Sequence, residues 1–371
     1  MGRRRYKQMG GQSFFGDMVY ERAVGQDHFL RHLGAVVEWE AFTELLIRLY
    51  KGAGEVGRPP YKPSVILKML VLSYLYDLSE RQTETFVNDS LSAKCFLGLA
   101  VDEKGPDHST LTAFKRRILR GGGEARLAEL LAEVVRQARE RGVEFGSIQL
   151  VDSTHTIADV NVKKDERRQG REGKPRRDRG ARWGVKHKRR FRDGKGKKVE
   201  QVQYFYGYKA HTSLNAQAEM ITSVVVTGGN AYDGHQFRAM VERDRHHGVM
   251  ADTYAGDRGY DDSENHYLLE HLGLKSAIKL NEYRTKKKDK NKQVWIDLLA
   301  SSEYQAGQKE RYKIERKYGE AKVYHGLRRC RYTGWLRYAI QAYLTAIALN
   351  LKRVVKLVTG VQFRGPALSG A

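Results

Sequence analysis

Three acidic residues stand where their carboxylates can act together on a phosphate group. Asp152 follows the apolar run 148–151, which has the composition of a buried strand. Asp257 lies between a short apolar run and a predicted helix, and Glu315 lies in a charged segment of helical pattern. A side chain at the C-terminal end of a strand faces the crevice where α/β sheets bind ligands. The chain layout therefore predicts that the three carboxylates converge.

Metal-assisted phosphoryl transfer is the chemistry that fits three such carboxylates. Two metal ions about 3.5–4 Å apart activate an attacking oxygen and stabilise a leaving one. Hard ions such as Mg²⁺ or Mn²⁺ prefer carboxylate oxygens. Water or a DNA 3′-hydroxyl then attacks, so no nucleophilic side chain is needed. We predict a site for two Mg²⁺ or Mn²⁺ ions held by Asp152, Asp257 and Glu315.

Each carboxylate also has a purely structural interpretation. An acidic residue after a strand is common in turns. Asp262 is the better helix cap in its segment, which leaves Asp257 to face the crevice. In a helix, Arg311, Glu315 and Lys322 share one face of alternating charge, and taken alone they indicate a solvated face with weak ion pairs.

Other chemistries find less support in the sequence. It contains no glycine-rich phosphate loop that ends in Lys-Ser or Lys-Thr, so an ATP-driven motor is not indicated. His108 and the pair 246–247 lack the spacing of a zinc site. Cys95 and Cys330 stand far apart, which indicates two buried hydrophobic residues rather than a disulfide framework or a zinc finger.

The charge balance favours a nucleic-acid partner. The 371 residues include 67 Lys and Arg against 44 Asp and Glu, for a formal charge of +23. Such an excess attracts polyanions. The most apolar stretch, 338–351, spans 14 residues, so we interpret it as a buried helix rather than a membrane span. The N-terminus lacks an apolar signal core, and we expect a cytoplasmic, nucleoid-associated protein.

The N-terminal part has helical periodicity throughout. Ser79 and Gln82 fit a capping box, and Ser109 is the expected N-cap of a helix that runs to Arg120. That helix carries a group of basic side chains, Lys115, Arg116, Arg117 and Arg120. A helix-turn-helix whose Lys115 and Arg116 contact DNA is one interpretation. An ordinary helical hairpin with a solvated basic face is the other.

After the glycines at 121–123 the pattern changes to alternating strands and helices, which predicts an α/β domain with a mixed sheet. The expected divisions are a helical DNA-end-binding and oligomerisation domain at 1–122, a linking helix at 123–145, a catalytic domain at 146–357 and a tail at 358–371.

Two polar stretches interrupt the predicted catalytic domain. Residues 163–198 contain 18 Lys or Arg and five Asp or Glu, so we expect a mobile arm that binds phosphates; a solubilising loop is the alternative. Residues 281–307 are interpreted as an insertion with a small hairpin or helix. Within it, Trp295 is expected either to stack on an unpaired base or to form the insertion's own core.

Several short motifs occur together in a fixed order. They are GRPPY (57–61), LSERQ (78–82), PDHSTL (106–111), VDST (151–154), YGYKAH (206–211) and GDRGYD (256–261), followed by the Glu315 segment. In this order they resemble the bacterial insertion-sequence transposases of the DDE superfamily, specifically insertion sequence family five. The family's pattern Tyr-x2-Arg-x3-Glu-x6-Lys is matched by Arg311, Glu315 and Lys322, while Gln308 stands at the tyrosine position.

The resemblance implies a ribonuclease-H-like catalytic domain, Mg²⁺ as the cofactor, and cutting and joining of the element's own DNA ends. It also implies a homodimer that binds double-stranded transposon ends and target DNA. By the same resemblance, Arg311 and Lys322 would hold DNA phosphates, and Lys209 and His211 would lie near the metals and the DNA. A ribonuclease-H-like nuclease without joining activity and an inactive DNA-binding regulator remain as alternatives.

Overall fold

The computed structural model describes residues 6–10, 14–50, 59–192, 194, 198–286 and 290–364. Two compact units make up the chain, one of Met1–Glu144 with Tyr343–Ala371 and one of Phe145–Ala342. One division between the units falls after Glu144, and the other falls inside the last helix, α15 (Trp335–Thr359). Gly57 and Arg58 of the GRPPY motif, and residues 365–371 of the expected tail, lie outside the described residues.

The first unit is helical. Its described helices before α15 are α1 (Phe14–Ala23), α2 (Phe29–Val36), α3 (Trp39–Leu46), the 3-10 turn η1 (Ile47–Leu49), α4 (Pro63–Leu75), α5 (Glu80–Asp89), α6 (Leu91–Leu97), α7 (His108–Arg120) and α8 (Glu124–Glu140). In α4 every residue except Lys68 is buried, because an apolar surface on all sides requires neighbours on all sides. Helix α4 contacts α3, α5, α6 and α7 and forms the centre of this unit.

The predicted helix starts are partly confirmed. The capping box of Ser79 and Gln82 is present at the start of α5. Helix α7 begins two residues earlier than expected, because Asp107 rather than Ser109 is the N-cap and its carboxylate accepts a hydrogen bond from the Thr110 amide. An aspartate side chain caps a helix as well as a serine, and Ser109 instead donates to Asp107.

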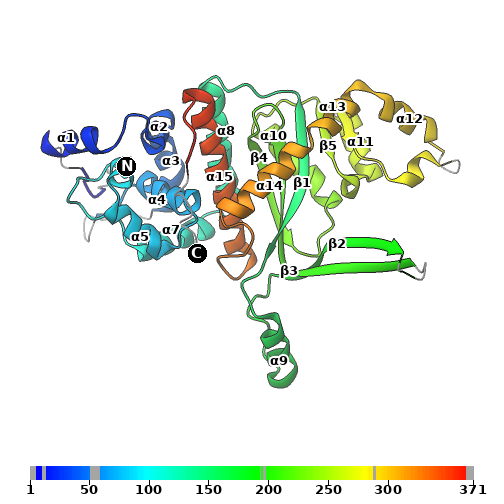
Figure 1. Ribbon diagram of the computed structural model, residues 1–371, viewed down its shortest axis with the longest axis horizontal. Coiled ribbons are helices and arrows are strands. Elements are labelled where there is room, and N and C mark those ends of the chain that lie inside the picture. Colours follow the sequence, from blue (N-terminus) through cyan, green and yellow to red (C-terminus); the bar gives the residue numbers. More distant parts are fainter. Residues whose placement is uncertain are drawn as a thin grey trace. The chain divides into compact units, whose positions relative to one another are not determined.

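A six-stranded mixed sheet forms the second unit (Figure 1). Its strands are β1 (Ile148–Ile157), β2 (Arg182–Arg192), β3 (Lys198–Asn215), β4 (Ile221–Gly228), β5 (Thr253–Gly256) and β6 (Lys275–Ile278). They are ordered β2-β3-β1-β5-β6, and β4 also pairs with β3. β1 is antiparallel to β3 and parallel to β5.

The sequence indicated that Asp152 lies at the end of a strand, but Asp152 lies inside β1. The strand continues because β3 accompanies it as far as the pair Ile157–Gly207. The parallel pairing with β5 stops earlier, at Leu150 and Ala255. Asp152 therefore stands just beyond the last β1–β5 pair, and Asp257 follows the last residue of β5.

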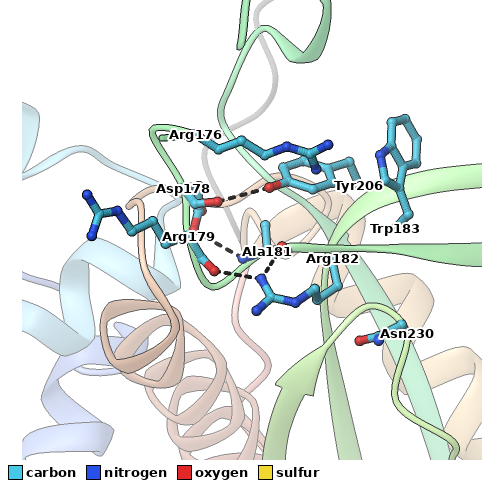
Figure 2. A pocket seen from close by; sticks show the side chains of 8 residues that line it. All are labelled: Arg176, Asp178, Arg179, Ala181, Arg182, Trp183, Tyr206 and Asn230. Carbon is cyan, nitrogen blue, oxygen red and sulfur yellow. Dashed lines mark hydrogen bonds between the residues drawn. The ribbon is translucent and has the colours of Figure 1, made fainter. Parts of the chain in front are cut away.

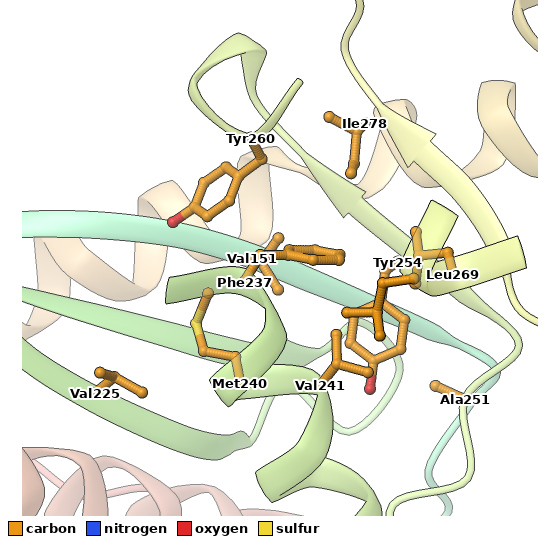
Figure 3. Packing of buried hydrophobic residues seen from close by; sticks show 11 residues of the cluster. Val151, Val225, Phe237, Met240, Val241, Ala251, Tyr254, Tyr260, Leu269 and Ile278 are labelled. Atoms are coloured by element: carbon orange, nitrogen blue, oxygen red, sulfur yellow. The ribbon is translucent and has the colours of Figure 1, made fainter. Parts of the chain in front are cut away.

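Helices cover both faces of this sheet. Helix α10 (Phe237–His246), preceded by the 3-10 turn η2 (Gly234–Gln236), packs on β3 and β4, and α11 (Ser263–His271) packs on β6. Their apolar side chains meet Val151 and Tyr254 in the core that Figure 3 shows. Because side chains alternate along a strand, Ala255 and Thr212 face the opposite side of the sheet. There α13 (Ser302–Glu310) and α14 (Tyr312–Tyr324) pack. A mixed sheet between helices is the predicted ribonuclease-H-like arrangement.

The basic segment 163–198 is ordered where the structure describes it, contrary to the expected mobile arm. It contains all but the first residue of helix α9 (Val162–Glu172), and it contains strand β2, which pairs with β3. The segment lacks an aliphatic core of its own, but β2 takes its backbone hydrogen bonds from β3, as a sheet edge allows. The composition of this segment does not allow it to fold alone, and it folds here by pairing with β3.

The insertion is helical. After the 3-10 turn η4 (Glu282–Thr285) come α12 (Lys292–Ala300) and α13 (Ser302–Glu310). The helical segment expected around Glu315 is interrupted at Arg311, and α14 (Tyr312–Tyr324) begins after it. Helix α13 lies so close to β5 and β6 that a Cβ at Gly307 would come within 2.5 Å of the Ala277 side chain.

Helix α15 contains the apolar stretch 338–351 and is buried along most of it. Among the described residues, no helix combines the length and hydropathy that a membrane span requires.

Candidate active site

Asp152 occupies the most strongly perturbed position among the candidate carboxylates. Part of its surface remains accessible, yet protein atoms surround most of the side chain. Loss of hydration, assisted by the negative charge of Asp257, raises the pKa of Asp152 to about 7. Oδ1 accepts a hydrogen bond of 2.8 Å from the Ser153 amide. The two carboxylates are therefore close enough to repel each other.

Asp257 caps the 3-10 turn η3 (Arg258–Tyr260). Its Oδ1 accepts a hydrogen bond of 2.8 Å from the Gly259 amide, and a Cβ on Gly259 would come within 2.9 Å of the same oxygen. A side chain at position 259 would therefore displace the Asp257 carboxylate from this hydrogen bond. Asp262 caps α11, as expected, and Asp257 also caps a turn, η3. One carboxylate oxygen of Asp257 therefore accepts a hydrogen bond from within its own turn.

Two hydrogen bonds tie the helices around Glu315 to the strands of the aspartates. Tyr318 Oη donates to the Asp152 carbonyl at 2.7 Å. On the other side of Glu315, Gln308 Nε2 donates to the Gly256 carbonyl at 3.1 Å, one residue before Asp257. Glutamine at the family's tyrosine position therefore has a structural contact of its own.

The Glu315 side chain itself points into solvent. It is 62% exposed, and its nearest ionic partner is Arg311 at 3.7 Å. Within the described part of the chain, no three His, Cys, Asp or Glu side chains are grouped so that they could hold a metal ion. The structure brings Asp152 and Asp257 together and brings the helix of Glu315 to them, but it does not place the Glu315 carboxylate with theirs.

Basic side chains surround the aspartates. The positive charge of Arg311 acts on Asp152 and opposes the rise of its pKa. Lys322 is half-buried, and its pKa is lowered by loss of hydration and by the nearby charge of Lys186. Burial and the charges of Lys322 and Lys186 together lower the pKa of His155 to about 4, so this imidazole is neutral at pH 7. The expected phosphate-binding residues Arg311 and Lys322 thus lie beside the carboxylate pair.

Comparisons with known proteins identify the family. Residues 144–351, more than half of the chain, match the family described as Transposase DDE domain. This chain belongs to the DDE transposases. Residues 18–117 match a second family, described as Transposase domain (DUF772). A solved structure, the Mos1 transposase paired-end complex with left transposon end, is similar over 73% of this chain and 82% of that chain, at 10% identity and a TM-score of 0.20. The narrower assignment to insertion sequence family five stays a prediction.

Lys209 and His211 of this transposase share a third aspartate that the sequence analysis missed. Lys209 Nζ donates to Asp233 Oδ1 at 2.9 Å, and His211 Nδ1 lies 3.6 Å from the same oxygen. Burial lowers the pKa of His211 to about 4 despite the opposing charge of Asp233. Asp233 also acts on Asp152. It lies five residues after the end of β4, in the turn before η2, so a rule that selects the residue directly after an apolar run does not find it.

Tyr260 was also missed. It lies in the GDRGYD motif and is fully buried, and its Oη has no hydrogen-bond partner in the described part of the chain. Burial raises the pKa of Tyr260 well above its usual value, and the charge of Asp152 adds to the rise. The phenol therefore stays protonated close to the aspartates.

Trp295 lies in the core of the insertion rather than on its surface. The indole is 8% exposed, packs 4.9 Å from the His266 ring, and has the Arg284 guanidinium 4.5 Å from its centroid. A side chain covered in this way cannot stack on a DNA base without moving. The structure favours the alternative interpretation of Trp295 as the insertion's own small core.

Lys115 differs from its basic neighbours. It is buried and forms an ion pair with Glu80 of α5, so the expectation that it is exposed for DNA contact was wrong. The reason is helical phase, because Leu111, Phe114 and Ile118 of α7 are buried and Lys115 lies on their side. Arg116, Arg117 and Arg120 are exposed.

Proposed function

We propose that this DDE transposase binds the terminal inverted repeats of its insertion sequence and catalyses metal-dependent DNA cleavage and strand transfer. The observation that carries the proposal is the meeting of Asp152 and Asp257 beside a helix that carries Glu315 and is bonded to the Asp152 carbonyl. Such a reaction on chromosomal DNA agrees with the nucleoid-associated location expected from the sequence.

The donor set fits two hard divalent ions. Asp152, Asp257 and Glu315 offer carboxylate oxygens, the ligands that Mg²⁺ and Mn²⁺ prefer. Glu315 would have to turn from solvent towards the aspartates. Its exposed pair with Arg311 opposes that turn by about 1 kcal/mol or less. When bound, the ions would activate the attacking oxygen and stabilise the leaving oxygen.

The chain's own residues would then hold the DNA. Arg311 and Lys322 are placed to bind phosphates on either side of the reacting one, because both lie near Asp152. Lys209 would hold Asp233 beside the same site through its hydrogen bond, and the neutral imidazole of His211 lies 3.6 Å from the same Asp233 oxygen. Tyr318 keeps α14 in position while the Glu315 side chain moves.

A strand-transfer assay tests this function. The DNA flanking the coding region supplies the candidate inverted repeats, and a pre-cleaved repeat with a 3′-hydroxyl is incubated with a plasmid target and Mg²⁺. Joined products are expected, and Asp152→Asn should abolish them while DNA binding persists. Hydrolysis without joining would instead assign a nuclease. Binding without any cleavage, unchanged in Asp152→Asn, would assign a regulator.

We also propose that a homodimer pairs two transposon ends. Light scattering of the protein bound to a repeat duplex should give two chains and two duplexes per particle. A particle with one chain and one duplex under cleavage conditions would contradict this.

A further inference from the structure

A pocket in the unit Phe145–Ala342 takes no part in the proposed phosphoryl transfer. It has a volume of about 410 Å³, within the range of about 300–1,000 Å³ typical of ligand sites. The side chains that matter for its chemistry are Arg176, Asp178, Arg182, Trp183, Tyr206 and Asn230 (Figure 2). They come from the segment before β2, from β2 and β3, and from the turn after β4. The pocket is thus built on the β2–β3 ladder.

Aromatic side chains form one wall of this pocket. Trp183 is 43% exposed and its ring centroid lies 5.5 Å from that of Tyr206, which is buried. The Arg176 guanidinium lies 5.3 Å from the Tyr206 centroid, and Figure 2 shows it stretched across that ring. Tyr206 is therefore covered, and Trp183 is the aromatic surface open to a ligand. Nucleobases stack on such surfaces whatever their sequence.

A buried acceptor without a partner lines the same pocket. Asp178 is fully buried, and its Oδ1 accepts hydrogen bonds from Tyr208 and from the amides of Gly180 and Ala181. Its Oδ2 has no hydrogen-bond partner among the residues that the structure describes. A buried carboxylate oxygen without a donor is unfavourable. It points to a ligand that supplies an N–H group.

Positive charge lies around that acceptor. Arg176, Arg179 and Arg182 line the pocket, and in the described part of the chain none of them has a carboxylate within ion-pair distance. Arg176 donates to Gln169 and Arg182 donates to backbone carbonyls, so their charges are not neutralised. Guanidinium groups of this kind bind phosphate. A simple anion would be repelled by Asp178, and an apolar ligand would leave the arginines unused.

We propose that this pocket binds one unpaired nucleotide of a DNA strand. The base stacks on Trp183, an amino group on the base donates to Asp178 Oδ2, and the flanking phosphates contact the arginines. Adenine, cytosine and guanine carry such an amino group, and thymine does not. DNA binding at this pocket requires no metal ion. A negative result for the pocket can therefore be distinguished from a failure of the proposed catalytic function.

The pocket is well separated from the aspartates. Tyr206 lies one residue beyond Gly207, which pairs with Ile157, five residues along β1 from Asp152. At about 3.3 Å per residue, the pocket is roughly 15–20 Å from the carboxylate pair. A strand whose reacting phosphate lies at Asp152 would reach the pocket with a nucleotide several positions away.

Binding of single-stranded DNA in EDTA tests the proposal. Fluorescence anisotropy compares a deoxycytidine oligonucleotide with an abasic strand of the same length, which keeps the phosphates and lacks the bases. For the wild-type protein and Trp183→Phe, loss of the bases should weaken binding about 5- to 150-fold, the range of a single base stack. For Trp183→Ala the two strands should bind within about twofold of each other.

Two controls complete the experiment. Tyr267→Ala removes another exposed aromatic, far along the chain on α11, and should behave as the wild type does. Asn230→Ala tests the opposite wall, with thermal melting to confirm that both pocket variants fold. The proposal would be overturned if the abasic strand bound more weakly than the deoxycytidine strand by the same factor in the wild type and in Trp183→Ala. So would equal affinity of the wild type for both strands, which would indicate a phosphate site alone.

Discussion

Tyr318 Oη donates a hydrogen bond of 2.7 Å to the backbone carbonyl of Asp152. The same hydroxyl is 2.7 Å from Thr212 Oγ1 on the neighbouring strand β3. Tyr318 follows Glu315 by about one helical turn, so these bonds fix the helix of the third proposed ligand directly against the strand of the first. This contact joins the helix that carries Glu315 to the strand that carries Asp152, although the two carboxylates do not touch in this structure.

Removal of that hydroxyl should impair catalysis more than folding. Tyr318→Phe keeps the ring and removes its hydrogen bond to the Asp152 carbonyl, so α14 loses a contact that fixes its register on β1. We expect Mg²⁺-dependent cleavage to fall about 10- to 100-fold, the usual effect of a displacement of about 1 Å near the chemistry. Tyr324→Phe, on the same helix with its ring 58% exposed, is the matched control and should cleave normally. Unchanged cleavage in Tyr318→Phe would show that the contact does not position Glu315.

The neighbours Lys115 and Arg116 should respond differently to truncation. Arg116→Ala should weaken duplex DNA binding and reduce the slope of log affinity against log salt by about 1, because one phosphate contact is lost. Lys115→Ala should destabilise the fold by about 3 kcal/mol, since it leaves Glu80 without its buried partner. Salt titrations and urea unfolding measure the two effects. A reduced salt slope in a stably folded Lys115→Ala protein would contradict this assignment.

The buried Asp244 should make stability depend on pH. It lies on α10, is fully buried and accepts hydrogen bonds from Gln149 and Tyr254, yet loss of hydration raises its pKa to about 6. A folded-state pKa above the unfolded value of 3.8 means that this contribution is present at low pH and lost as pH rises through about 6.

Asp244→Asn removes the titrating group and serves as the reference. Relative to this variant, the wild-type free energy of unfolding should fall by about 2 kcal/mol between about pH 4 and pH 8. Denaturant unfolding at a series of pH values gives both curves. Parallel curves would mean that Asp244 does not titrate in this range.

The fold and part of the site were predictable from local patterns. Asp152 and Asp257 were recognised because each follows a short apolar run, and the strands at these two places, β1 and β5, are parallel neighbours. The capping box at Ser79 was equally local. These features depend on residues within a few positions of one another, which a single sequence displays.

The missed features depend on partners that are distant in sequence. The segment 163–198 folds because β2 pairs with β3, and no composition rule shows that pairing. Lys115 lies on the buried side of α7, where Glu80 of another helix pairs with its ammonium group. Trp295 is covered by His266 and Arg284 from outside its own helix. In each case a tertiary contact reversed what the local pattern indicated.

The central claim is that Asp152, Asp257 and Glu315 hold one pair of metal ions, and iron-mediated cleavage of the protein tests it directly. Fe²⁺ bound in place of Mg²⁺, with ascorbate and peroxide, produces hydroxyl radicals that cut the polypeptide beside the ion. With the repeat duplex bound, we predict cuts near residues 152, 257 and 315, all suppressed by Mg²⁺ and absent in Asp152→Asn. Cuts near 152 and 257 with the segment around Glu315 intact would contradict the three-carboxylate site.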